Sequence, residues 1–140
     1  MRPKQYKIPP NEYRTLLKQL ELIEIRLVKS NCVLNNKDGK IQPVDIQEKT
    51  QISPLGSDKV QILHTYNLSA KFENSDDFFI KISATYEITF ICTFNDNKDF
   101  FDIYKQVSLP LNTFPFFREF VFNTTGRMNI RPLTLPLVIL

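Results

Sequence analysis

The stretch from Asn112 to Leu137, NTFPFFREFVFNTTGRMNIRPLTLPL, decides the fold of this 140-residue chain. Its first two-thirds are predicted to form a helix. Asn112 or Thr113 can cap the start, and Pro115 suits the first turn, where a missing N–H costs little. Pro132 marks the exit, because proline cannot continue a helix. The stretch therefore predicts one long helix followed by an irregular apolar strip.

The predicted helix is apolar around well over half of its circumference. An ordinary surface helix needs an apolar arc of only ~100° or slightly more. We therefore expect the helix to pack on two sides, against its own sheet and against a second surface. At helical spacing one face carries Phe114, Phe117, Phe120, Val121, Thr124 and Met128, and Phe116 and Phe122 flank it on opposite sides.

Four segments before this helix alternate apolar and polar residues with the period of two that is typical of strands. The clearest is 78–93, where one face is apolar and the other carries lysine, serine, threonine and glutamate. Antiparallel sheets commonly have one face packed against the core and the other exposed to solvent. The others span 21–34, 41–52 and 59–73, and Pro43 makes the second an edge strand or a bulged one.

Two shorter helices are predicted beside these strands. Residues 11–19 place Tyr13, Leu16 and Leu17 at helical spacing, and a second helix begins after residues 95–98 and ends at Pro110. The order helix, four strands and helices predicts an α+β fold. It is a four-stranded antiparallel sheet with an N-terminal helix and C-terminal helices packed on one face. The length suits one domain, residues 1–140.

Composition excludes several classes of protein. The net charge of +3 comes from interspersed acidic and basic residues, so we predict no binding to nucleic acid. No apolar run is long enough to span a membrane, and residues 1–10 do not resemble a signal peptide. Cys32 and Cys92 lie in predicted strands without CxxC spacing, which favours two buried thiols over a disulfide. We therefore expect a cytoplasmic protein.

No combination of residues indicates catalysis. His64, the one histidine, lies in the apolar series of its strand, so we expect a hydrogen-bonded core side chain rather than a base or ligand. Neither metal-ligand spacing nor a glycine-rich phosphate loop occurs. The sequence therefore predicts no enzyme, metal or cofactor. Adjacent phenylalanines at 78–79, 100–101 and 116–117 cannot all point inward, so some apolar surface is expected to meet a partner or ligand.

Three motifs in the C-terminal stretch carry a family resemblance. They are FPFFRE at 114–119, TTGRM at 124–128 and PLTL at 132–135. Together they resemble the C-terminal signature of the SecB-like chaperones, nearest to those that accompany toxin–antitoxin pairs. The resemblance is specific over about 25 residues, and over the rest of the chain the match to the family is diffuse.

The resemblance implies a fold, an assembly and two sets of residues. The fold is a four-stranded antiparallel sheet with helices behind it, in dimers that pair into a homotetramer. The long helix would lie at the interfaces through Phe114, Phe116, Phe117, Phe120 and Phe122. Unfolded protein segments would bind in apolar grooves lined by Ile23, Ile25, Leu27, Ile41, Val44, Ile46, Leu133, Leu135 and Leu137.

Departures from the general export chaperone refine the functional prediction. This chain is mildly basic, and we expect an extra N-terminal helix and no counterpart of the family's last helix and tail, which makes docking to the motor ATPase SecA doubtful. The resemblance thus implies an ATP-independent chaperone that protects an antitoxin from aggregation and proteolysis. An export chaperone that delivers preproteins to SecA is one alternative. A small apolar-ligand carrier is an alternative of another class.

Overall fold

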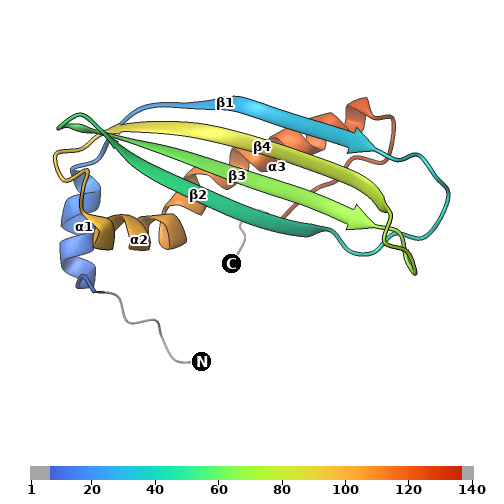
Figure 1. Ribbon diagram of the computed structural model, residues 1–140, viewed down its shortest axis with the longest axis horizontal. Helices are drawn as coiled ribbons and strands as arrows, with labels where there is room; N and C mark the ends of the chain where they lie inside the picture. The colour runs from blue at the N-terminus through green and yellow to red at the C-terminus, as the bar shows by residue number, and fades with distance from the viewer. Residues whose placement is uncertain (1–6, 137–140) are drawn as a thin grey trace.

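The computed structural model describes residues 7–136, which form one four-stranded sheet and three helices. The strand order is β1-β4-β3-β2, and every neighbouring pair is antiparallel. Figure 1 shows α3 crossing one face of the sheet and α1 and α2 at one end. The predicted sheet and helices are thus confirmed. In chain order the elements are α1 (Pro10–Lys18), β1 (Glu21–Leu34), β2 (Asp45–Leu55), β3 (Lys59–Lys71), β4 (Phe78–Ile91), α2 (Lys98–Val107) and α3 (Leu109–Arg127).

The core lies between the two central strands and the helices. In β3, and in β4 from Ile80 onward, the even-numbered residues point toward the helices and are buried, as the alternation in the sequence predicts. Tyr66 of β3 stacks on Phe117 of α3 with ring centroids 4.8 Å apart. Its hydroxyl lies 2.7 Å from Thr113 Oγ1, so one ring is both packed and hydrogen-bonded beneath the sheet.

The N-terminal helix docks mainly through one buried aromatic side chain. Tyr13 is the buried residue of α1, and its ring centroid lies 5.2 Å from that of Phe100 in α2. The Tyr13 hydroxyl also lies 2.6 Å from Ser108 Oγ, between α2 and α3. A nine-residue helix is marginal alone in water, so the Tyr13 contacts, together with the half-buried Leu16 and Leu17 that pack on the core, hold α1 in place.

The long helix begins earlier than the sequence predicts. Its first residue is Leu109, so Pro110 lies in the first turn and Pro115 lies inside the helix. Pro110 opens α3 instead of ending α2, because a first-turn N–H has no intrahelical partner to lose. Asn112 does not cap the helix, and its side-chain amide donates to the Tyr104 hydroxyl at 2.9 Å.

Two further predictions need correction at the sheet edges. The second strand runs from Asp45 to Leu55, while Ile41 forms only an isolated bridge with Phe72. Pro43 accounts for the late start, since proline cannot donate to a ladder. Cys92 is buried as predicted, but Cys32 is exposed because it lies on β1, whose residues are exposed or only half-buried.

Within residues 7–136 no helix combines the length and the apolar character that crossing a bilayer requires.

Candidate functional site

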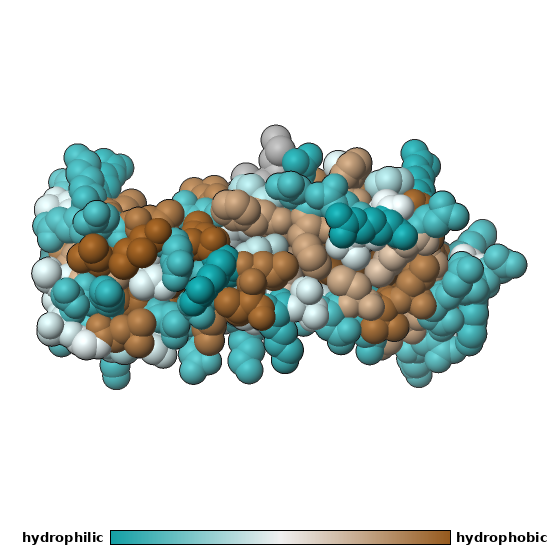
Figure 2. All heavy atoms as spheres, turned by 90° about the horizontal axis from the view of Figure 1, so that it is seen from above, coloured by the Kyte–Doolittle hydropathy of each residue, from teal (hydrophilic) through white to brown (hydrophobic). Residues whose placement is uncertain are grey.

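An apolar hollow of about 260 Å³ lies between β1 and α3. It forms because β1 is an edge strand that α3 does not cover, so side chains on its helix-facing side stay exposed. Figure 2 looks onto the β1 side of the molecule and shows apolar patches separated by polar side chains along its length. The hollow is lined by Ile25, Arg26, Leu27, Tyr86, Phe116, Glu119, Phe120 and Asn123.

This β1–α3 hollow joins residues that the sequence analysis assigned to different roles. Ile25 and Leu27 were predicted to line a client groove, whereas Phe116 and Phe120 were predicted to form a subunit interface. Ile23, the third of the β1 groove residues, is 46% exposed and lies at a bulge, where the β1–β4 ladder skips one residue. The uncovered strand and the outer side of α3 therefore make one continuous surface.

The five phenylalanines predicted at a subunit interface divide into two groups. Phe114 and Phe117 are buried beneath the sheet and belong to the subunit's own core. Phe116 and Phe122 are about half-exposed, at 48% and 47%, and Phe120 is half-buried. Only the second group is on the surface, so an interface through α3 rests on Phe116, Phe120 and Phe122.

A second hollow, of about 440 Å³, lies where the loop before β2 meets the C-terminal strip. It brings Ile41 and Leu133 together, although they are 92 positions apart in the sequence. Of the other predicted groove residues, Val44 and Ile46 are half-buried against the core. Leu135 is buried, and Leu137 lies outside the described residues. The remaining lining residues are Phe79, Ile130, Arg131, Pro132 and Thr134.

Two side chains of α3 fix the C-terminal strip, here residues 130–136. Arg118 Nε donates to the carbonyl oxygen of Leu135 at 2.8 Å. The backbone N–H of Leu133 donates to Thr125 Oγ1 at 2.9 Å, and that buried hydroxyl donates to the Val121 carbonyl. The sequence analysis gave Arg118 no role beyond its place in the FPFFRE motif. Its position inside the FPFFRE motif was the signal that could have revealed this contact.

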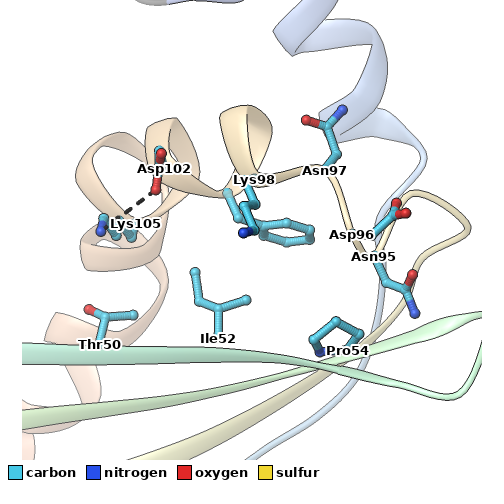
Figure 3. A pocket seen from close by; sticks show the side chains of 10 residues that line it. Thr50, Ile52, Pro54, Asn95, Asp96, Asn97, Lys98, Asp102 and Lys105 are labelled. Carbon is cyan, nitrogen blue, oxygen red and sulfur yellow. Dashed lines mark ion pairs between the residues drawn. The ribbon is translucent and has the colours of Figure 1, made fainter.

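A third hollow, of about 340 Å³, lies between β2 and α2 and was not expected from the sequence. Figure 3 shows Thr50, Ile52 and Pro54 rising from β2 toward α2, with Lys98 above them. Asn95 shapes the adjoining loop, because its side-chain amide donates to the carbonyls of Gly56 and Lys59 at 3.0 and 2.9 Å. The β2–α2 hollow also includes Asp96, Asn97, Phe101, Asp102 and Lys105.

His64 is a buried and hydrogen-bonded core side chain, as predicted. Its Nδ1 lies 2.7 Å from Thr50 Oγ1 and its Nε2 lies 3.1 Å from Glu48 Oε1. A neutral ring can accept from Thr50 and donate to Glu48, so both nitrogens are satisfied. Burial lowers the pKa of His64, although the Glu48 carboxylate opposes that shift. The cluster ties β2 to β3 at cross-strand partners.

The sheet face away from the helices is polar. Arg26 of β1 and Glu87 of β4 form an ion pair with Nη2 and Oε1 2.8 Å apart. Thr65 and Thr85 share a hydroxyl–hydroxyl contact of 2.8 Å across β3 and β4. Among residues 7–136 no group of three or more histidine, cysteine, aspartate or glutamate side chains is placed to hold a metal ion. The apolar hollows are therefore the main candidate functional surfaces.

Comparisons with known proteins bear on the fold. No protein-family model matches the sequence, and no curated protein matches it. A solved SecB-like chaperone from Mycobacterium tuberculosis, in complex with an antitoxin peptide, superposes with a TM-score of 0.75 at 15% identity. The match covers 91% of this chain and 96% of that one. A protein of unknown function from Streptococcus agalactiae reaches only 0.46 at 9% identity, over 84% and 96%, and carries no argument. This chain therefore has the SecB-like fold that its C-terminal motifs resemble.

Proposed function

We propose that this protein is an ATP-independent molecular chaperone that holds unfolded apolar segments of other proteins. The observation that carries the proposal is exposed apolar surface on a SecB-like fold, continuous over β1 and α3 and present again before β2. Monomers rarely expose large contiguous apolar surface unless it meets a partner. The exposed large apolar side chains include Leu22, Ile23, Leu27, Val28, Val33, Ile41, Phe116 and Phe122.

The physics of such surfaces suits holding a client without a chemical energy source. Burial of apolar area stabilises a complex by roughly 25 cal/mol per Å² and requires no particular side-chain sequence. Ordering a disordered segment opposes binding, which keeps each local contact weak and adaptable. Shallow hollows such as those before β2 and between β2 and α2 would therefore bind an unfolded chain by many small contributions.

We propose an antitoxin as the client. The SecB-like chaperone from Mycobacterium tuberculosis is bound to an antitoxin peptide, and that peptide is a short segment of a longer protein. On this model the chaperone acts in the cytoplasm and shields an aggregation-prone antitoxin segment from proteolysis. Its removal would free the toxin. The mixed charge of the polar sheet face, with Arg26 paired to Glu87, supports a dedicated client rather than a docking site for SecA.

We further propose that the β1–α3 hollow is covered by a second copy of the chain in a dimer, and that two dimers form a homotetramer. Phe116, Phe120 and Phe122 lie on the exposed side of α3, next to the uncovered side of β1. Covering this surface would bury apolar side chains that a lone subunit leaves in water. The hollow at Ile41 and Leu133 then remains for the client.

The deciding experiment measures light-scattering mass and suppression of aggregation in the absence of nucleotide. The probe is a reduced and alkylated protein, which stays unfolded. We expect a mass near four times 16.4 kDa, uptake of the probe and less light scattering from the aggregating protein. A monomer that ignores the probe would contradict the proposal. If such a monomer carried co-purified lipid, the hollows would instead belong to a small apolar-ligand carrier.

A further inference from the structure

The two edges of the sheet differ in regularity. β2 pairs with β3 over eleven consecutive residue pairs without a register shift, whereas the β1–β4 ladder is interrupted near Ile23 and again near Val28. Bulges twist an edge and spoil it as a template, so the regular edge is β2. Among the described residues, the side of β2 away from β3 has no backbone hydrogen-bond partner.

The free edge of β2 is accessible to another chain. Along the strand Gln47, Glu48, Lys49 and Gln51 are all exposed. Pro54 lacks an N–H, so it fits a ladder position whose N–H would point to solvent. Backbone direction alternates along a strand, so the N–H groups of the other even-numbered residues point the same way.

Apolar hollows lie at both ends of this edge. The hollow at Ile41 and Leu133 precedes the strand, and the β2–α2 hollow with Thr50, Ile52 and Pro54 flanks its last residues. At about 3.3 Å per residue, residues 41–54 extend over roughly 40 Å. An extended segment on this track would run beside unpaired backbone groups and meet an apolar hollow at each end.

We infer that an extended segment of the client adds to β2 as a fifth strand and places one apolar side chain in the β2–α2 hollow. This inference rests on the proposed chaperone function and names where the client backbone is held. Strand addition lets backbone hydrogen bonds supply affinity while a pocket for alternate side chains supplies selectivity. Burying that side chain against Ile52 and Pro54 adds the apolar contribution.

The charged side chains around the β2–α2 hollow determine which extended segments bind best. Lys98 has no ion-pair partner among the described residues, and Figure 3 shows it above the hollow. Lys105 pairs with Asp102 at 3.8 Å, and Asp96 lies on the rim. The unpaired ammonium group favours a client carboxylate next to the apolar side chain. The occupant is therefore an extended segment of alternating apolar and polar residues with one acidic residue.

Features of β2 disfavour a second copy of the chain as the occupant. Glu48 is a charged residue on the helix-facing side, Lys49 is charged on the other side, and Pro54 lies near the end. Charges and prolines on edge strands are the devices that prevent pairing of identical edges. They leave an alternating segment of a different protein, with its single acidic residue near Lys98, free to pair along the central part of the strand.

A pair of N-methylated peptides tests the inference on the full-length chain. The probe is a fluorescent twelve-residue peptide of alternating leucine and threonine with one glutamate. In the first peptide every second backbone nitrogen is methylated, which removes the N–H donors on one edge of the peptide. In the second peptide the methyl groups are moved by one residue, which removes the N–H donors on the other edge. We expect one of the two methylated peptides to bind about tenfold or more weakly than the unmethylated peptide, and the other to bind almost unchanged. Bound peptide should slow hydrogen exchange of the β2 amides.

Charge reversal at Lys98 tests the second part of the inference. Lys98→Glu should weaken the glutamate peptide about two- to fivefold and strengthen a peptide with lysine at that position. Lys81→Glu, on the polar face of the sheet, is the matched control and should change neither. Lys98 begins α2, where an acidic residue suits the helix dipole, so the variant is expected to fold.

The outcomes separate this inference from the proposed function. If both methylated peptides bind equally and exchange in β2 is unchanged, while unfolded protein is still held, strand addition is wrong and the chaperone proposal stands. If neither the peptide nor unfolded protein binds, both are wrong.

Discussion

At the scale of single residues, His64 shows how a polar group is accommodated in an apolar core. Its ring packs edge-on against Tyr66 at 4.6 Å, and both ring nitrogens have partners on β2. A buried polar group without hydrogen-bond partners lowers the stability of the folded state by ~1–3 kcal/mol. Thr50 and Glu48 avoid this loss by bonding both ring nitrogens of His64. The cluster therefore links β2 to β3 through side-chain hydrogen bonds.

The lowered pKa of His64 gives a pH dependence with a definite sign. The folded chain takes up the proton less readily than the unfolded chain, whose histidine titrates near 6.5. The contribution to stability is therefore complete above about pH 6.5 and decreases as the pH falls below it. Urea unfolding from about pH 7 to about pH 5 should show a steeper loss for the native chain than for His64→Gln. Parallel curves would contradict this account.

At the scale of elements, the C-terminal strip and α3 act as one unit. Leu135 is buried and Leu133 half-buried, yet the strip has no regular secondary structure to hold it. Its position depends on the Arg118 and Thr125 contacts with its backbone. Because the strip lines the hollow at Ile41, those two side chains also determine the width of that hollow.

Removal of the Arg118 contact should release the strip without unfolding the sheet. In Arg118→Ala the carbonyl of Leu135 loses a charge-assisted hydrogen bond of about 1.5–3 kcal/mol. We expect faster hydrogen exchange at Leu133 and faster protease cleavage within residues 130–136, with β3 and β4 unchanged. Arg127→Ala, in the last turn of α3, is the control. Equal exchange in the two variants would show that Arg118 does not hold the strip.

At the scale of the whole molecule, the uncovered side of β1 links fold and assembly. Cys32 lies on this side and is exposed in the lone chain, while Cys92 is buried. If a second copy covers the β1–α3 hollow, Cys32 should react slowly with a maleimide in the assembled protein. The Phe116→Glu variant should be monomeric and react quickly, because a charge in the interface would be costly to bury.

Cys92 provides the internal control for this labelling experiment, since it should react only after unfolding. Equal labelling of Cys32 in the native protein and in Phe116→Glu, at concentrations where the native protein is a tetramer, would exclude β1 from the interface.

The sequence predicted most of the sheet because local rules determine it. Alternation in β3 and β4 gave their buried faces, and turn residues gave the loops. The start of α3 was missed because Pro110 fits both the end of one helix and the first turn of the next. The exposure of Cys32 was missed because alternation gives the face of a strand but not whether a helix covers that face.

The candidate surfaces were harder to predict than the fold. Ile41 and Leu133 were both assigned to a groove from the resemblance, and they do meet. The β2–α2 hollow was missed because Ile52 and Lys98 are far apart in sequence and carry no shared pattern. Whether Phe117 or Phe116 faces the core depends on the rotation of α3 against the sheet, which a helix apolar on most sides leaves undetermined.

If a second copy covers the uncovered inner side of β1, as proposed, the stability of each subunit depends on the concentration of the protein. A newly made subunit would then carry exposed helix-facing strand residues such as Leu22 and Leu27 until another copy arrives, so its lifetime would depend on how many copies are present. Below a threshold of synthesis, lone subunits would meet cellular proteases before they meet each other. A cell that makes this protein slowly would then have little of it, and a modest fall in expression would produce an abrupt loss of the assembled form.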